Sequence, residues 1–444
     1  MFRIYPVPEF EAKCPVDNED LSVEDILIPG MRCLADTLCP GCGNKYFVDL
    51  PVGQAIWSPT TINQATKEVY DDCGITWFSH LLLEDYQSQS SQEIVPVVHK
   101  FYDAERIIIV NCLDFLYGHS LLKLLNVQRY LDQYPELGCC VLVPTQLVHL
   151  VPKGVAEIWE FPVKIKEGRR WYPSLNNWLK KQIVSRKECF LSKAYSHPGN
   201  KFYDLHQFAH DLPDITEEIK GGSPVILFNY REDRNWGESL SRQQRNLQKL
   251  YDKLSAVFPD MLFVLAGFGK KNQLIEGKSR IIDLRAESFD VETDKLWMAY
   301  MSNADCAIGV HGSNMLLPSG LAKTTIELVP RDRMGNTIQS FLFSSERQDV
   351  RDGLLHYRML YGDDQLTNIL PSQVVELVIY LLSLAPVNAA WFKVGENAAA
   401  MQDLIRCQQS PVFQQRIKYN RPQAQSGLES RLKNIAKKVL WRLD

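Results

Sequence analysis

Short apolar runs alternate with amphipathic stretches through the middle of the chain. Runs rich in β-branched or aliphatic residues lie at 106–111, at 140–143 and near Ile158, as expected for strands buried on both faces of a sheet. Between the first two runs, residues 118–134 place leucines at helical spacing and end just before Pro135. This alternation predicts a parallel sheet with helices packed on it.

The same alternation begins again after the breaker Lys-Gly-Gly-Ser-Pro at 220–224. The first helix of this second part is predicted at 241–258, because its leucines form one stripe and Pro259 ends it. The other predicted elements are strands at 225–228, 261–266, 281–284, 306–309 and 325–328, and a helix at 295–301. We therefore expect an α/β protein with two Rossmann-like domains that face a cleft, where ligands bind at the carboxyl ends of the strands.

Four regions follow from these patterns. They are a Cys-containing, loop-rich head at 1–74, an N-terminal Rossmann-like domain at 75–220, a C-terminal Rossmann-like domain at 221–395 and a helical basic tail at 396–444. A chain of 444 residues has room for two or three domains, and 45% hydrophobic with 23% charged residues excludes a largely disordered protein.

Charge and cysteine content narrow the class of protein further. A net charge of −4 argues against a nucleic-acid-binding protein. The sequence has no apolar run of about 18 residues and does not start like a signal peptide. Its 11 cysteines are an odd number spread over a long chain, which suits a reducing compartment. We therefore expect a cytoplasmic protein.

The segment 309–320 carries the most informative motif. It reads Gly-Val-His-Gly-Ser-Asn-Met-Leu-Leu-Pro-Ser-Gly and directly follows a predicted strand. Backbone N–H groups after such a strand can bind phosphate, and His311 can donate to a phosphate oxygen. Glu327, on the next strand, can accept hydrogen bonds from ribose hydroxyls. The alternative is a tight turn with a buried histidine and a charged strand end.

Residues 305–320, followed by Ile-Glu-Leu-Val-Pro at 326–330, resemble the donor-site signature of family 61 glycosyltransferases. Upstream, Asn-Tyr-Arg-Glu-Asp-Arg-Asn-Trp at 229–236 is similar to the paired arginines of the same family. The resemblance covers roughly residues 222–335, the size of one domain. It implies the GT-B fold and an inverting hexosyl- or pentosyltransferase of polysaccharide biosynthesis that needs no catalytic metal. The sugar would pass from a nucleotide-diphosphate donor to a hydroxyl of a glycan or lipid-linked acceptor.

The resemblance also implies roles for individual residues. The donor-binding residues would be Arg231, Arg234, His311, Gly312, Ser313, Asn314 and Glu327. The two arginines would neutralise the departing diphosphate, since guanidinium groups bind phosphate oxygens bidentately. The 311–313 turn would contact the diphosphate, Asn314 would position that turn, and Glu327 would hold the ribose. For the arginines, the alternative is a solvated loop with ion pairs to Glu232 and Asp233.

The catalytic base should lie in the first domain, just past the strand at 106–111. Asp114 and His119 are the candidates, because both precede or begin a predicted helix at the carboxyl end of that strand. Either could take the proton of a sugar hydroxyl. The alternatives are a turn residue for Asp114 and a locally packed helix residue for His119.

The head contains the sequence Cys39-Pro-Gly-Cys42-Gly, which is typical of a zinc knuckle. Cys33 and Cys14 could supply two further ligands of a structural zinc ion. Free thiols in a loop and a redox dithiol are the alternatives.

The tail at 427–444 places apolar residues at helical spacing, and the segment 416–444 has eight basic against two acidic residues. Such a helix could lie on an anionic membrane at the inner face, pack on the acidic body, or contact a partner. Two rival functions remain open. One is another GT-B-like nucleotide-sugar enzyme, such as an epimerase, and the other is a non-catalytic protein that binds a glycan or a partner.

Overall fold

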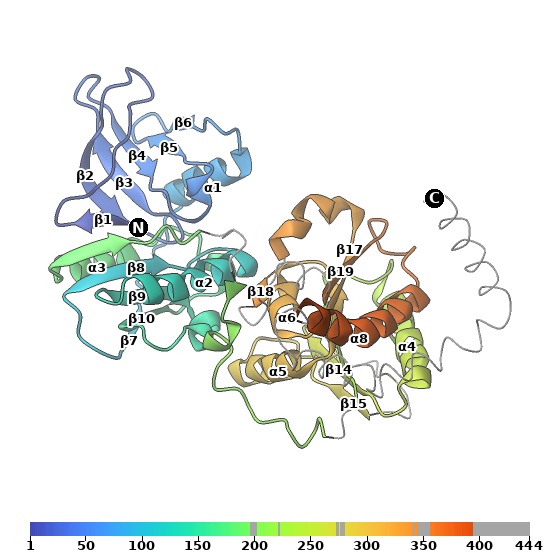
Figure 1. Cartoon of the computed structure of the whole chain (residues 1–444). Helices are drawn as coiled ribbons and strands as arrows, with labels where there is room; N and C mark the ends of the chain where they lie inside the picture. Colours follow the sequence, from blue (N-terminus) through green and yellow to red (C-terminus); the bar gives the residue numbers. More distant parts are fainter. Residues whose placement is uncertain are drawn as a thin grey trace, which may run out of the picture. The chain divides into compact units, whose positions relative to one another are not determined.

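The computed structural model describes residues 1–195, 202–220, 223–271, 275, 280–340, 342–344 and 356–393. It divides the chain into two compact units, Met1–His210 and Asp211–Asp444 (Figure 1). The predicted tail at 396–444, including the proposed membrane-binding helix at 427–444, lies outside the described residues. Of the helices that are described, none combines the length and the apolar character needed to cross a membrane.

Unit 1 contains a doubly wound sheet. Its described parallel strands lie in the order β11-β8-β9-β10, and β1 and β7 pair antiparallel at the two edges. The strands are β1 (Phe2–Tyr5), β7 (Val97–Lys100), β8 (Arg106–Asn111), β9 (Gly138–Pro144), β10 (Glu157–Phe161) and β11 (Glu188–Leu191). The three strands expected near 106–111, 140–143 and Ile158 are confirmed. The strand order reverses between β8 and β11, which puts the ligand-binding edge of this sheet at their carboxyl ends.

Helices and short turns connect these strands. They are α2 (Tyr117–Gln133), η2 (Thr145–Leu150), η3 (Ile165–Glu167) and α3 (Pro173–Val184), followed by the short strand β12 (Phe202–Tyr203) and η4 (Leu205–Gln207). α2 matches the helix predicted at 118–134, and its buried leucines face β8 and β9. α3 begins with Pro173 in its first turn, where a missing N–H has no cost.

The head was expected to be rich in loops, but it contains an antiparallel sheet and a helix. Residues 22–70 form an antiparallel sheet in the order β2-β3-β4-β5-β6, followed by α1 (Figure 1). The elements are β2 (Ser22–Leu27), β3 (Leu34–Leu38), β4 (Lys45–Asp49), η1 (Gly53–Ile56), β5 (Thr61–Asn63), β6 (Val69–Tyr70) and α1 (Thr76–Gln87). The strands are so short that their side-chain alternation is weak in the sequence. Their shared core includes Trp171, so the head packs onto the rest of unit 1.

Unit 2 contains a second doubly wound sheet, in which all described strands are parallel. The order is β15-β14-β13-β16-β17-β19, which in chain order is 3-2-1-4-5-6, the arrangement of Rossmann domains. The strands are β13 (Val225–Tyr230), β14 (Leu262–Gly267), β15 (Arg280–Asp283), β16 (Cys306–Val310), β17 (Thr325–Val329) and β19 (Tyr357–Tyr361), with a short β18 (Phe343–Ser344) before the last. The order reverses between β13 and β16.

Two groups of helices accompany this sheet, with α4 packed on α8 and α5 on α6. The helical elements are α4 (Leu240–Val257), α5 (Val291–Asn303), η5 (Ser313–Met315), α6 (Leu316–Leu321), η6 (Arg331–Ser340) and α8 (Pro371–Lys393). The Ser239 hydroxyl caps α4 and the Asp290 carboxylate caps α5, each accepting a backbone N–H of the first turn. The predicted α/β class, with two Rossmann-like sheets and a small Cys-containing N-terminal region, is confirmed.

Candidate functional site

The first candidate site lies in unit 2, where the sheet order reverses. β13 ends at Tyr230 and is followed by Arg231, while the neighbouring β16 ends at Val310 and is followed by His311. Asn229, the last but one residue of β13, donates from Nδ2 to the backbone oxygen of Asn314 at 2.6 Å. Two predicted motifs that are about 80 residues apart in the chain therefore meet at the edge where doubly wound sheets bind ligands.

Both predicted arginines reach the turn after β16. Arg234 Nη1 donates to the backbone oxygen of His311 at 2.9 Å, and Arg231 Nη1 donates to Asn314 Oδ1 at 2.7 Å. Arg231 also donates from Nε to Asp233 Oδ1 at 2.7 Å. The alternative, an ion pair within the loop, is therefore present between Arg231 and Asp233. The hydrogen bonds from Arg231 lower the pKa of the Asp233 carboxyl, although the partial burial of that carboxyl acts in the opposite direction. Both guanidinium groups nevertheless converge on one turn.

A third arginine, Arg333 in η6, lies near enough to Arg234 to act on its charge. Burial lowers the pKa of the Arg234 guanidinium, and the nearby charges of Arg231 and Arg333 lower it further. The carboxylates of Asp233 and Asp332 act on Arg234 in the opposite direction, and Arg333 itself pairs with Asp332, with Nε 3.1 Å from Oδ2. No sequence pattern pointed to Arg333, which stands in a polar stretch after β17.

Gly312 lies next to the guanidinium groups of Arg231 and Arg234. Its φ of +153° and ψ of 179° belong to a backbone region that is essentially open only to glycine. A Cβ at this position would lie 2.3 Å from Arg231 Nη1 and 3.0 Å from Arg234 Nη1. The backbone conformation therefore favours glycine here, and a Cβ would displace the ends of the two arginine side chains.

The side chains of His311 and Glu327 do not open onto a ligand-accessible edge, contrary to expectation. Their exposed fractions are 3% and 0%, and His311 Nδ1 lies 2.9 Å from Glu327 Oε1. The Tyr357 hydroxyl from β19 donates to the other carboxylate oxygen, and burial together with the Glu327 charge raises the tyrosine pKa well above its usual value. Both carboxylate oxygens of Glu327 are thus engaged inside unit 2, and the predicted contact of Glu327 with a ribose stays a prediction.

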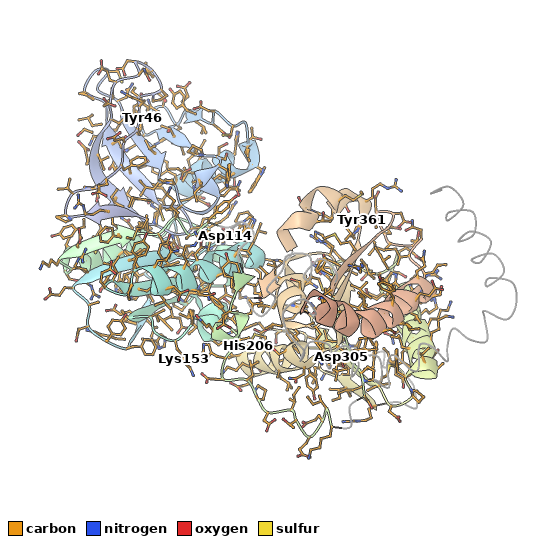
Figure 2. All side chains as sticks on the ribbon, viewed as in Figure 1. Tyr46, Asp114, Lys153, His206, Asp305 and Tyr361 are labelled. Atoms are coloured by element: carbon orange, nitrogen blue, oxygen red, sulfur yellow. The ribbon has the colours of Figure 1, made fainter. Side chains whose placement is uncertain are left out.

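The candidate bases lie in unit 1, after the carboxyl end of β8, and Asp114 is labelled in Figure 2. Asp114 is buried, with Oδ2 2.9 Å from Lys123 Nζ and Oδ1 3.5 Å from His119 Nδ1. Burial alone would raise the Asp114 pKa, but the charge of Lys123 and the hydrogen bond from His119 hold it well below its usual range. A carboxylate that binds a proton so weakly is a poor base. His119 fits that role better, with Asp114 holding its ring as a positioning residue.

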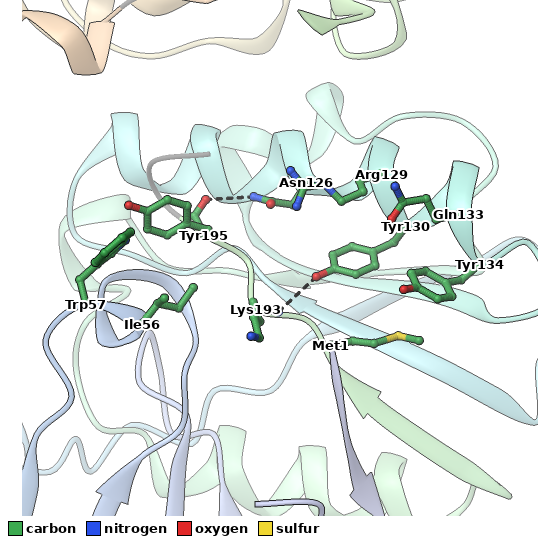
Figure 3. A pocket seen from close by; sticks show the side chains of 10 residues that line it. All are labelled: Met1, Ile56, Trp57, Asn126, Arg129, Tyr130, Gln133, Tyr134, Lys193 and Tyr195. Atoms are coloured by element: carbon green, nitrogen blue, oxygen red, sulfur yellow. Dashed lines mark hydrogen bonds between the residues drawn. The ribbon is translucent and has the colours of Figure 1, made fainter. Parts of the chain in front are cut away.

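A cavity of about 390 Å³ in unit 1 offers a second place for a ligand (Figure 3). Trp57 and Tyr195 lie on one side of it, with ring centroids 5.8 Å apart. Arg129 and Lys193 bring positive charge to the same cavity. The wall is fixed by a hydrogen bond from Asn126 Nδ2 to the Tyr195 backbone oxygen at 3.0 Å, drawn in Figure 3. An aromatic pair beside cations suits a sugar ring that carries anionic groups.

The structure brings together only three of the four cysteines proposed as zinc ligands. Ligand atoms of Cys14, Asp17, Cys39 and Cys42 all lie within 4.8 Å of one another in the head. Cys33 is wrong as a ligand, because its buried sulfur accepts a hydrogen bond from Asn111 Nδ2 at 3.4 Å, in another part of unit 1. Asp17 completes the cluster instead, and the only sequence signal for it was its place three residues after Cys14.

Comparison with known proteins yields structural likenesses at low identity. No protein-family model matches the chain, and a search of curated proteins found no match either. The chain is similar to the Escherichia coli ADP-heptose lipopolysaccharide heptosyltransferase II, with 11% identity and a TM-score of 0.39 over 62% of this chain and 98% of that one. A family 9 glycosyl transferase from Veillonella parvula matches with 11% identity and a TM-score of 0.39 over 64% and 99%. A putative UDP-N-acetylglucosamine 2-epimerase from Listeria monocytogenes matches with 10% identity and a TM-score of 0.34 over 68% and 91%. The resemblance to family 61 therefore stays a prediction.

Proposed function

We propose that this protein is a glycosyltransferase of the GT-B type. It would move a sugar from a nucleotide-diphosphate donor to a hydroxyl of a glycan or lipid-linked acceptor, with inversion and without a catalytic metal. One observation carries the proposal: Arg231 and Arg234 converge on the His311–Gly312 turn at the switch point of a 3-2-1-4-5-6 parallel sheet. In open α/β sheets this is the position at which nucleotides bind.

The donor diphosphate is proposed to bind against the two guanidinium groups. A guanidinium is planar and can donate two parallel hydrogen bonds to phosphate oxygens. Arg231 makes such a pair with the Asp233 carboxylate in this structure, so a phosphate would take the place of that carboxylate. Both are already held in place by the turn, since Arg231 reaches Asn314 and Arg234 reaches the His311 backbone. Groups that are oriented before the reaction stabilise developing charge at little cost in reorganisation.

For the chemical step we propose a direct displacement. The acceptor oxygen attacks the anomeric carbon of the sugar while the bond from that carbon to the diphosphate oxygen breaks. The negative charge that builds on the leaving diphosphate is stabilised by Arg231 and Arg234, as a metal ion would otherwise do. The proton of the acceptor hydroxyl passes to a base, for which we propose His119, with Asp114 fixing the orientation of the ring.

The acceptor is proposed to use the cavity lined by Trp57 and Tyr195. The aromatic faces would stack on the apolar face of a sugar ring, and Arg129 and Lys193 would pair with phosphate or carboxylate groups of the acceptor. An acceptor with such anionic groups is compatible with either a glycan or a lipid-linked sugar.

A binding screen tests the proposal directly. Purified full-length protein is mixed with ADP, CDP, GDP, UDP and dTDP, and the melting temperature is recorded; at least one nucleotide should raise it. Arg231→Ala and Arg234→Ala should abolish that rise, whereas the control Arg245→Ala, at an exposed position of α4, should keep it. Failure of every nucleotide to stabilise the protein would refute a nucleotide-diphosphate donor.

The nucleotide that binds then identifies the sugar donors to be tested for turnover. Release of the nucleoside diphosphate only when an acceptor is present supports a transferase. Conversion of the nucleotide sugar to an isomer without an acceptor would show the rival epimerase. Binding without turnover, over a broad acceptor panel, would favour the rival binding protein.

A further inference from the structure

The cluster of three cysteines and one aspartate in the head has no part in the proposed transfer reaction. Cys14 and Asp17 come from the segment before β2, while Cys39 and Cys42 come from the turn between β3 and β4. Around it lies a small apolar cluster that includes Tyr46, the residue labelled in the head in Figure 2. So small a core leaves the two segments weakly attached unless another interaction joins them.

The distances in the cluster match those between ligands of one tetrahedral ion. With Zn–S bonds of about 2.3 Å, two thiolates on one zinc ion lie ~3.8 Å apart, and a thiolate and a carboxylate oxygen lie ~3.6 Å apart. Here the sulfurs of Cys14 and Cys42 are 3.7 Å apart, and the sulfur of Cys39 lies 3.3 Å from Asp17 Oδ2. A disulfide would require the two sulfurs at about 2.05 Å.

Nitrogen donors surround the sulfurs in a way that suits thiolates. The backbone N–H of Cys42 donates to the sulfur of Cys39 at 3.4 Å, and the backbone N–H of Val16 donates to the sulfur of Cys14 at 3.4 Å. The side-chain amide of Asn44 donates to the sulfur of Cys42 at 3.3 Å. Each of the three sulfurs thus accepts a hydrogen bond from nitrogen, and such outer partners orient and stabilise metal-bound thiolates.

The absence of a side chain at Gly41 leaves room for the Asp17 carboxylate beside the knuckle turn. A Cβ at this position would lie 2.6 Å from Asp17 Oδ2 and 3.1 Å from Glu19 Cγ. Only a residue without a side chain lets the knuckle turn and the Asp17 carboxylate approach each other so closely.

We propose that Cys14, Asp17, Cys39 and Cys42 bind one structural zinc ion. Three soft thiolates with one carboxylate are ligands that select zinc over magnesium or calcium. Four protein ligands leave no open position for a substrate, so the ion would stabilise the fold of the head and would not take part in catalysis. The zinc would tie the segment before β2 to the β3–β4 turn.

Metal analysis of the full-length protein, purified with a reductant, tests this proposal. The wild type should contain about one zinc per chain, and the double variant Cys39→Ser/Cys42→Ser should contain none. Cys73→Ser is the matched control, because Cys73 is an exposed cysteine of the same unit that lies outside the cluster. Absence of zinc from the wild type after incubation with zinc, or an unchanged zinc content in the double variant, would overturn the proposal.

Spectroscopy keeps the test decisive if the double variant does not fold. Wild-type protein loaded with Co²⁺ in place of zinc should show the visible and near-ultraviolet bands of a tetrahedral thiolate site. Asp17→Cys should retain zinc, since it converts the site to four thiolates, and it should strengthen the charge-transfer band. A Co²⁺ spectrum without thiolate bands would contradict the site, as would a protein mass showing a disulfide between cluster cysteines in place of zinc.

Discussion

Replacing Gly312 by alanine should weaken the binding of a nucleoside diphosphate more than it weakens the fold. The new methyl group would stand 2.3 Å from Arg231 Nη1, a distance that Cβ atoms essentially never adopt, and 3.0 Å from Arg234 Nη1, which is tighter than most Cβ contacts. One or both guanidinium groups must therefore move off the turn that holds them. The substitution therefore displaces the guanidinium groups but leaves both positive charges in the protein.

The size of the effect follows from the hydrogen bonds that would be lost. A hydrogen bond to a charged group contributes about 1.5–3 kcal/mol, so one misplaced guanidinium should weaken binding about 10- to 150-fold. The backbone conformation, with φ at +153°, adds a folding cost of about 1–3 kcal/mol for a residue with a Cβ. The variant should thus fold with a lower melting temperature and bind the nucleotide poorly.

Isothermal titration with the nucleotide found in the thermal screen measures the loss of affinity. Urea unfolding measures the loss of folding stability. Gly335→Ala is the control, because a Cβ at Gly335 meets no atom within 4 Å and its exposed position lies in the same unit. A folded Gly312→Ala protein that binds the nucleotide as tightly as wild type would refute the placement of the diphosphate against Arg231 and Arg234.

Four further predictions concern unit 1. His119→Gln should reduce turnover by about 10²- to 10⁴-fold with nucleotide binding unchanged, and equal turnover in steady-state assays would exclude it as the base. Asp114→Asn should lower the free energy of unfolding by about 3–5 kcal/mol in urea, because a buried lysine ammonium loses its partner. The lowered pKa of Asp114 also means that this stability is present at neutral pH and is lost as the pH falls below about 4. Trp57→Ala should raise the acceptor KM about 2- to 10-fold, whereas Trp77→Ala, at another exposed tryptophan of the same unit, should not. An acceptor KM that is the same in both variants would contradict acceptor binding in the cavity. Burial raises the pKa of Asp85 to about 6, so its protonation should stabilise the protein as the pH falls from about 6 to about 4, and Asp85→Asn should abolish that part of the pH dependence of the melting temperature.

Much of the candidate donor site could be predicted because its residues follow directly from local signals. Each parallel strand buried on both faces leaves an apolar run, and the polar residues just after it must lie at the carboxyl edge of the sheet. This rule located Arg231 after β13 and His311 after β16. The edge strands β7 and β19 escaped the same reasoning, since β7 is largely exposed and β19 mixes aromatic and charged residues, so neither gives a continuous apolar run.

The sequence by itself thus determined the α/β alternation, most strand positions and the side of the sheet on which the motif residues lie. Only the tertiary structure decided that the Glu327 carboxylate pairs with His311 and Tyr357, that Arg333 comes near Arg234, and that Asp17 takes the place of Cys33 in the cysteine cluster. The physical reason is the range of the interactions. Strand and helix periods arise from neighbours in the chain, whereas burial depth and ligand sets arise from contacts between segments that are distant in sequence.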